Sequence, residues 1–368
     1  MSPHFSTVVV LGAGLIGRLL AWVLAQRGHV VDLYDAGGPA AEQSAATVAA
    51  AMLAPLAESA VTEPGVVRMG QYALQRWPEL IADLPENVFF QQQGTLIVWH
   101  RQDAPEAQRL RARLAHTAQQ IPELPPARDL DARSLSAVEP ALSGRFAQGL
   151  LLPDEGQLDN RQLLKALTSA IDQAGVRCHW NTPRSPADIP AHSDGGPSLL
   201  LDCRGLGARS DWQKLRGVRG EVVRIHAPDV QLQRPTRLVH PRYPIYIAPK
   251  PNGVFVIGAT EIESEDRSPV SVRSTLELLS AAYAVHPGFA EARVIEAATQ
   301  CRPTLPDNLP ALRIPRPGVL EVNGLYRHGF MIAPAMLDCV LQWLECGHST
   351  LARRFDLNIE TLASHALA

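Results

Sequence analysis

The sequence predicts an α/β protein with two domains. One is a Rossmann-like domain that opens the chain, and the other is an interleaved α+β domain built on an antiparallel sheet. Three observations predict this fold class. The first 36 residues follow the order strand, glycine-rich turn, helix and strand. Residues 217–225 and 246–260 alternate as antiparallel strands do. The chain has 368 residues, 46% of them hydrophobic, which is enough for two hydrophobic cores.

The opening stretch, residues 7–36, has the pattern of a βαβ unit. Residues 8–11 are apolar and mostly β-branched, which is typical of a strand that is buried on both faces. Three glycines then follow at the G-x-G-x-x-G spacing. Gly12 permits a tight turn, Gly14 lets the backbone approach a pyrophosphate, and Gly17 lets the helix lie close to the strand.

The helix after this turn begins with Leu15 and Ile16, and we expect it to end at Gly28. Its N-terminus would direct backbone N–H groups at the phosphates of a dinucleotide. Residues 30–34 form the next strand, and Asp35 ends it. An acidic residue at this place binds the ribose hydroxyls of an adenosine. The complete series predicts a dinucleotide site, where an isolated glycine motif would be weak evidence.

The composition excludes several classes of protein. A formal net charge of -3 offers no basic surface for nucleic acid, so no such partner is expected. The five cysteines are scattered and show no C-x-x-C pair, which argues against a disulfide scaffold or a metal site and for a reducing compartment. No apolar run is long enough to predict a membrane span. We therefore expect a cytoplasmic protein.

Residues 40–60 are rich in alanine and predict a helix, with the hydroxyls of Ser44 and Thr47 near its start. On composition alone this is an ordinary alanine-rich helix. Its pattern S-A-A-x-x-A-A-A-M-L-A-P occurs together with LGAGLIG at residues 11–17 and with Asp35. This combination resembles the FAD-dependent D-amino-acid oxidase family and, within it, the glycine oxidases of thiamine biosynthesis.

The resemblance implies FAD as the cofactor, bound without a covalent link. In the family, the segment that matches residues 44–52 runs under the FAD, and the backbone near Ala51 and Met52 approaches the isoalloxazine ring. The chain departs from the family pattern at Asp35, where a glutamate is usual. The shorter side chain keeps the negative charge but changes its reach toward the ribose.

The resemblance implies further FAD contacts along the chain. The backbone of Val176 would meet the adenine, after a helix that begins at Asp159 or Asn160. Gly205 lies in a turn that contacts FAD in the family, although residues 202–204 are D-C-R here instead of small residues. The backbone that wraps the pyrimidine edge of the flavin would be that of Gly329, Phe330, Met331 and Ile332.

The resemblance also implies a discontinuous domain organisation. The FAD-binding domain would comprise residues 1–85, 145–212 and 298–360. The substrate domain would comprise residues 86–144 and 213–297, and its antiparallel sheet would cover one face of the flavin.

Four residues are candidates for substrate binding. Arg302, followed by proline, matches the family's carboxylate-binding arginine, and a planar guanidinium suits a carboxylate because it offers two parallel donors. Tyr246 matches the tyrosine that hydrogen-bonds the same carboxylate, with Tyr243 as the alternative register. Arg327 matches a second active-site arginine of glycine oxidases. Glu261 is placed to receive the substrate ammonium.

The activity implied is oxidative deamination of a small amino acid or amine, of the glycine, sarcosine or D-alanine class. Hydride would pass to flavin N5, and dioxygen would reoxidise the flavin with release of hydrogen peroxide. An oxo acid and ammonia or an amine would be the other products, and a homo-oligomer is expected.

Three alternatives stay open at this point. One is a sarcosine-oxidase-like enzyme, with FAD linked to Cys301, although Val256 stands where those enzymes have a lysine. Another is a D-amino-acid-dehydrogenase-like enzyme. The third is a flavoprotein maturation factor that modifies a partner protein.

Overall fold

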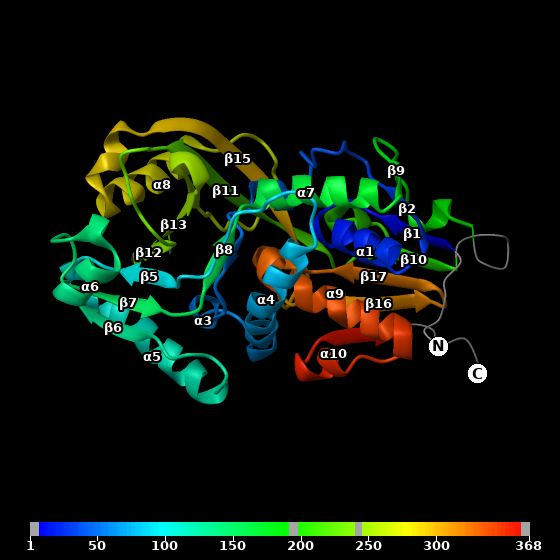
Figure 1. Ribbon diagram of the computed structural model, residues 1–368, viewed down its shortest axis with the longest axis horizontal. Coiled ribbons are helices and arrows are strands. Elements are labelled where there is room, and N and C mark those ends of the chain that lie inside the picture. Colours follow the sequence, from blue (N-terminus) through cyan, green and yellow to red (C-terminus); the bar gives the residue numbers. More distant parts are fainter. Residues whose placement is uncertain (1–6, 191–197, 240–244, 362–368) are drawn as a thin grey trace.

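The computed structural model of the chain describes residues 7–190, 198–239 and 245–361. Two large sheets lie next to each other along the long axis, each with its own covering helices (Figure 1). One sheet is mostly parallel and the other is mostly antiparallel. The predicted fold class is therefore confirmed, while the residue boundaries of the two domains remain a prediction.

Strand β1 (Thr7–Leu11) lies inside a seven-stranded sheet, where it pairs in parallel with a strand on each side. Its last four residues are buried, as expected for an apolar strand in the middle of a parallel sheet. The strands follow in the order β18 (Asn358–Thr361), β16 (Ala311–Arg316), β17 (Val319–Asn323), β10 (Leu199–Asp202), β1, β2 (Val30–Tyr34) and β9 (Arg177–His179).

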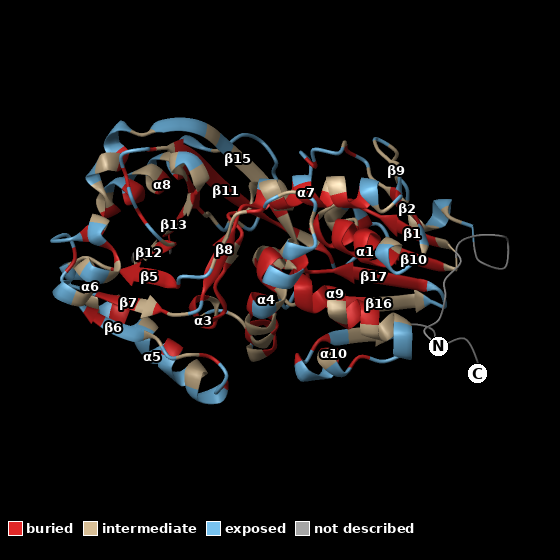
Figure 2. Cartoon of the chain, viewed as in Figure 1, coloured by how far each residue is buried: buried red, intermediate tan, exposed pale blue. Residues whose placement is uncertain are grey.

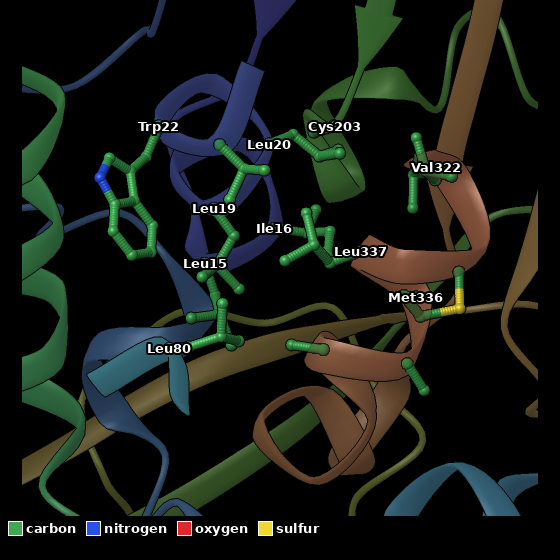
Figure 3. Packing of buried hydrophobic residues seen from close by; sticks show 14 of the residues in the cluster. Leu15, Ile16, Leu19, Leu20, Trp22, Leu80, Cys203, Val322, Met336 and Leu337 are labelled. Carbon is green, nitrogen blue, oxygen red and sulfur yellow. The ribbon is translucent and has the colours of Figure 1, made fainter. Parts of the chain in front are cut away.

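Helix α1 (Leu15–Gln26) is buried between this sheet and two other helices, α7 (Asn160–Gln173) and α9 (Gly329–Cys346). The side chain of Ile16 lies next to that of Leu337 of α9, and Leu15 and Leu19 belong to the same core (Figure 3). Helix α7 begins as the sequence predicts, because the Asp159 carboxylate accepts hydrogen bonds from two backbone N–H groups of the first turn. The sheet on one side and helices α7 and α9 on the other thus hold α1, and the turn before it, in place.

Helix α9 begins at Gly329, five residues before Pro334, although a proline is favoured in the first turn of a helix and disfavoured inside it. A proline inside a helix has no N–H to give to the carbonyl four residues before it, here that of Phe330. The indole Nε1 of Trp77 donates to that carbonyl at 2.8 Å. Trp77 is fully buried on helix α4 (Pro64–Ala82) and supplies the hydrogen bond that Pro334 cannot.

The eight-stranded sheet forms the other half of the molecule. Its strands follow in the order β15 (Arg293–Thr304), β11 (Arg216–His226), β14 (Val254–Gly258), β13 (Ile245–Lys250), β12 (Thr236–Leu238), β5 (Thr95–Val98), β7 (Gln148–Leu152) and β6 (Arg128–Asp131). Neighbouring strands are antiparallel except for the pair of β12 and β5. A small sheet of β3 (Met52–Leu53), β8 (Gly156–Leu158) and β4 (Phe90–Gln91) joins the two halves.

Residues 86–152 pair differently from what their sequence pattern suggests. Residues 89–98 have the pattern of a strand pair, but β4 pairs with β8, and β5 pairs with β7 and β12. Residues 101–146 have the polar pattern of solvent-exposed helices, but they include strand β6 between two helices. Strand β7 belongs to the eight-stranded sheet. Four further helices are α5 (Ala104–Gln120), α6 (Ala132–Val138), α8 (Val272–Val285) and α10 (Thr350–Arg354).

The alanine-rich stretch 40–60 is not one helix, so this prediction was wrong. It forms α2 (Ala45–Val48), strand β3 and α3 (Pro55–Glu58), and Ala51 between them has a φ of 52°. The side chain of Asn160 donates to the carbonyls of Ala46 at 2.7 Å and Thr47 at 2.8 Å. Because these carbonyls are bound from outside the segment, tertiary contacts override its helix propensity.

Buried residues lie in the two sheets and in the helices between them, whereas exposed residues lie on outer helices such as α5 and α6 (Figure 2). Within the part of the chain that the structure describes, one helical stretch, Tyr326–Cys346, is long and apolar enough to cross a membrane. Its most apolar window is 61% buried inside the protein, as the core helix α9 requires.

Candidate active site

A cavity of about 880 Å³ is lined by residues from both large sheets. Most of the predicted site residues share it. Those in the lining are Gly12, Gly14, Leu15, Ile16, Asp35, Ser44, Ala51, Met52, Gly205, Tyr246, Glu261, Arg302, Arg327, Gly329, Phe330 and Met331. Four predicted cofactor residues, Gly17, Thr47, Val176 and Ile332, lie outside this lining.

The contacts of these four residues explain their position. A Cβ at Gly17 would lie 1.8 Å from the carbonyl oxygen of Gly12, so Gly17 lets the helix approach the turn, as predicted. The Thr47 hydroxyl donates to the carbonyl of Ala41 at 2.6 Å. Val176 and Ile332 belong to the hydrophobic core. The backbone contacts to FAD that were predicted for these residues remain predictions.

The turn from β1 to α1 leaves a helix N-terminus open to the cavity. Gly12 has a φ of 92°, a conformation that favours glycine. Gly14 is the N-cap of α1, and no side chain in the described ranges caps this end. The backbone N–H groups of the first turn are therefore available to an anion, and the helix dipole favours one there.

The carboxylate of Asp35 is held by backbone N–H groups on both of its oxygens. Oδ2 accepts from Ala13 at 2.5 Å and Oδ1 accepts from Gly37 at 2.7 Å. The side chain thereby connects the end of β2 to the glycine-rich turn. Each carboxylate oxygen has a second lone pair, so Asp35 can still accept a hydrogen bond from a hydroxyl in the cavity.

The unusual D-C-R turn after β10 has a structural explanation. Arg204 forms ion pairs with Asp202 and Asp211, each at 2.6 Å. The next residue, Gly205, has a φ of 56° and its carbonyl accepts from the side chain of Asn323 at 2.9 Å. The charged residues thus bind one another, while the backbone at Gly205 still lines the cavity.

The eight-stranded sheet directs one row of residues at the cavity. This row crosses four neighbouring strands at paired positions. Its members are Arg237 of β12, Tyr246 of β13, Gly258 of β14 and Val222 of β11. Residues that oppose one another in a sheet point to the same face. Arg302 of β15 lies opposite Val218, which shares the face of Val222. The face toward the cavity therefore has Arg237 and Tyr246 at one end and Arg302 at the other.

Arg302 is the arginine of this face without a carboxylate partner among the described residues. Its Nη2 donates to the carbonyl of Thr260 at 3.1 Å and its Nη1 to that of Arg219 at 3.4 Å. Three further N–H groups stay available. Tyr246 is placed in the same lining, and burial raises the pKa of its phenol, which keeps it a hydrogen-bond donor. The alternative, Tyr243, lies outside the described residues.

Glu58, which the sequence analysis did not select, organises the other charged groups of the cavity. Its carboxylate lies 2.6 Å from Arg237, 2.8 Å from Arg327 and 3.2 Å from Nε2 of His328. Burial alone would raise the pKa of Glu58, but Arg327 and Arg237 hold it well below its usual range. Arg327 also binds Glu261 at 2.7 Å, so it lies between two carboxylates.

This arrangement shows the partners of two further charged or polar residues, His328 and Glu261. His328 has the sequence position of a turn residue, but it is 4% exposed, lines the cavity and contacts Glu58. Glu261 faces Arg327, and although burial would raise its pKa, Tyr326 and Arg327 lower it. The signal that could have indicated Glu58 is a lone acidic residue after the apolar stretch at residues 50–57.

Comparison with known families decides the class of this site. The family model described as FAD dependent oxidoreductase (DAO) matches residues 7–342. The chain belongs to this family. It is an FAD-dependent oxidoreductase of the amino-acid and amine-oxidising type, as the sequence resemblance implied.

The relatives of this DAO-family chain include named oxidases. A Rhizobium etli protein that carries the name thiamine biosynthesis oxidoreductase ThiO is 40% identical over 330 residues, covering 89% of this chain and 93% of its own length. Glycine oxidase of Geobacillus kaustophilus is 26% identical over 364 residues, covering 90% of each chain. The crystal structure of that enzyme has a TM-score of 0.80 at 24% identity and covers 98% of this chain and 99% of its own.

The structure of an iminodiacetate oxidase from Chelativorans sp. BNC1 has a TM-score of 0.77 at 20% identity, with 96% of this chain and 99% of that one covered. These structural likenesses confirm the fold of the DAO family over nearly the whole chain.

The residues of the cavity fit the FAD of this family. The uncapped α1 N-terminus suits a pyrophosphate, and the Gly14 position has room for close approach, since a Cβ there would meet only the Ser44 hydroxyl at 3.4 Å. Asp35 can accept from a ribose hydroxyl. The alanines between Ala45 and Ala51 give a lining of small side chains.

Proposed function

We propose that this enzyme oxidises a small amino acid or amine carrying one carboxylate, of the glycine, sarcosine or D-alanine class. The observation that carries the proposal is the guanidinium of Arg302, which faces the cavity beside Tyr246 with no carboxylate partner among the described residues. A planar fork with free donors is suited to a carboxylate. Arg302 and Tyr246 would therefore hold the substrate carboxylate.

The ion pairs of the cavity leave Arg302 as the arginine that can attract a substrate carboxylate. Glu58 pairs with Arg237 and Arg327, and Glu261 pairs with Arg327. Arg302 has no carboxylate partner among the described residues. Its positive charge therefore remains for a ligand with one negative charge, such as an amino acid with a neutral amine.

The proposed reaction removes a hydride from the α-carbon and a proton from the nitrogen. FAD, when bound, supplies the acceptor for the hydride. The resulting imine takes up water to give an oxo acid and ammonia or an amine, and dioxygen takes up the two electrons and two protons as hydrogen peroxide. The protein would contribute orientation through Arg302 and Tyr246, and a lining that excludes water.

Non-covalent binding of FAD is part of this proposal. Cys301 belongs to the cavity lining but is 2% exposed, and its Sγ lies 3.6 Å from the carbonyl oxygen of Asp266. Burial raises the pKa of this thiol, so the thiolate needed for attachment is disfavoured. Colour that stays with acid-precipitated protein would instead indicate a covalent flavin.

The names of the relatives support the substrate class, since they include a glycine oxidase and a thiamine biosynthesis oxidoreductase. The test is anaerobic mixing of the FAD-loaded enzyme with glycine, sarcosine and D-alanine in turn, followed by visible absorption. Bleaching of the flavin, with peroxide formed once air is admitted, is the expected result. A flavin that none of the three reduces would contradict the proposal and direct attention to larger amines or a protein substrate.

A further inference from the structure

Two glycines of the eight-stranded sheet occupy positions where a side chain would collide with Arg302 and Tyr246. A Cβ at Gly220 would lie 2.4 Å from Cζ and from Nη2 of Arg302. A Cβ at Gly258 would lie 2.7 Å from the hydroxyl oxygen of Tyr246 and 2.9 Å from its Cζ. Non-bonded carbon contacts are near 3.5–4.0 Å, so these distances are steric clashes.

These contacts show the direction of both side chains. Arg302 belongs to β15, and its guanidinium lies over Gly220 of the neighbouring strand β11. Tyr246 belongs to β13, and its phenol lies over Gly258 of the neighbouring strand β14. Strands β11 and β14 are themselves neighbours. The two side chains therefore lean toward each other from opposite sides, across the two middle strands.

A positive φ does not explain either glycine. Gly220 lies inside β11, and Gly258 is the last residue of β14, where a cis peptide bond joins it to Ala259. Neither has the positive φ that Gly12 and Gly205 have. Glycine weakens the interior of a strand, and it often marks a place where another group approaches closely. The group that approaches Gly220 is the guanidinium. At Gly258 it is the phenol, together with Cγ1 of Val222 at 2.9 Å from the Cβ position.

We propose that Gly220 and Gly258 are positioning residues of the carboxylate subsite, because their missing side chains let Arg302 and Tyr246 lie flat on the sheet with converging donors. The inference rests on the proposed function in one respect, namely that the ligand of these donors is a carboxylate. Val222, opposite Gly258, forms the apolar floor between them. The carboxylate of a substrate is thus bound against the middle of the sheet face.

The test is a double-mutant cycle on ligand binding. The probe is glycolate, which keeps the carboxylate of glycine and replaces its amine by a hydroxyl. Its Kd is measured from the perturbed visible absorption of the FAD-loaded protein, without turnover. Gly220→Ala should weaken glycolate binding roughly 10- to 100-fold, as Arg302→Ala should. The double variant should bind no more weakly than Arg302→Ala, because Gly220 acts through Arg302.

A purely structural role for Gly220 predicts a different outcome. Losses that add in the double variant, or unchanged binding by Gly220→Ala, would overturn the inference. Gly258→Ala with Tyr246→Phe forms an independent second cycle if the first variant fails to fold. Gly38→Ala is the control for the substitution itself, since the nearest atom to a Cβ there is 4.0 Å away.

A crystal structure of Gly220→Ala tests the geometry without any ligand. The guanidinium of Arg302 must leave its place over β11, and a guanidinium that stays there would refute the inference. Wild-type protein that neither binds glycolate nor is reduced by glycine, sarcosine or D-alanine would instead refute the proposed function. The two failures are therefore distinguishable.

Discussion

A carboxylate oxygen of Asp35 accepts a hydrogen bond from the backbone N–H of Ala13, at 2.5 Å, across the turn that opens the dinucleotide site. The other oxygen accepts from Gly37 at 2.7 Å. Where the family usually has a glutamate, the shorter side chain thus binds the glycine-rich turn itself. This contact organises the turn as well as offering an acceptor to the ribose.

Asp35→Asn should weaken FAD binding by about 10-fold or more, because an amide replaces one of two acceptors and removes the charge. Equilibrium titration of apoprotein with FAD, followed by flavin fluorescence, measures the change. The matched control is Asp32→Asn on the same strand, whose carboxylate pairs with Arg177 and His179 at the surface. Equal losses in the two variants would show that Asp35 has no special role.

Glu58→Gln should lower the free energy of unfolding by about 3 kcal/mol, because it leaves Arg237 and Arg327 without their shared buried counter-ion. Urea unfolding of the FAD-loaded protein measures this. Glu106→Gln removes an exposed pair with Arg109 on α5 and should change stability by less than about 1 kcal/mol. A Glu58 variant as stable as this control would mean that the two arginines find other partners.

Because of Glu155, the free energy of unfolding should fall as the pH rises. An acid in a salt bridge has the opposite effect. Its side chain is fully buried, one oxygen accepts from the backbone of Ala57 at 2.8 Å, and the other has no partner in the described structure. Burial raises the pKa of Glu155 to about 7 from its usual 4.5. Between these values the folded state binds more protons than the unfolded state, so stability falls as the pH rises.

Glu155→Gln removes this titration and should raise the free energy of unfolding by about 1–3 kcal/mol at pH 8 while changing it little at pH 4.5. Chemical denaturation at a series of pH values from 4.5 to 8 measures the difference between the variant and the wild type. A difference that stays constant across this range would contradict the raised pKa.

The parts of the site that could be predicted from sequence depend on residues close together in the chain. Gly12 and Gly14 set the local path of the turn, and Asp159 caps a helix within three residues of itself. The Glu58 cluster could not be predicted in this way. Glu58 is 179 residues from Arg237 and 270 from His328, and those contacts exist only once both sheets are placed.

The secondary structure of the alanine-rich segment could not be predicted either, again because it depends on residues distant in sequence. Its residues favour a helix, but the helix ends after Val48 because groups distant in sequence take its carbonyls. Asn160 binds two of them, and the ammonium of Lys250 binds that of Ala50 at 2.8 Å. Helix propensity was therefore a poor guide where buried donors from other elements compete for the backbone.

Lys250 is a buried link between β13, the backbone at Ala50 and β8. Its Nζ donates to the carbonyl of Ala50 at 2.8 Å, to that of Leu158 at 2.7 Å and to the Gln157 side chain at 3.0 Å. An ammonium has three donors, and all three are used. The next residue after Ala50, Ala51, has a φ of 52°, a conformation that costs a non-glycine residue free energy and requires support from its surroundings.

Lys250→Met should therefore release the Ala50 and Ala51 backbone and weaken FAD binding about 10-fold. The variant leaves three buried acceptors without donors, so its free energy of unfolding should fall by about 2–4 kcal/mol. Burial lowers the pKa of Lys250 to about 7 from its usual 10.5. Between these values the unfolded state holds the extra proton, so the wild type should gain stability relative to the variant as the pH rises through this range. Lys214→Met, at an exposed site, is the matched control. FAD affinity and stability that match this control would show that the backbone keeps its conformation without Lys250.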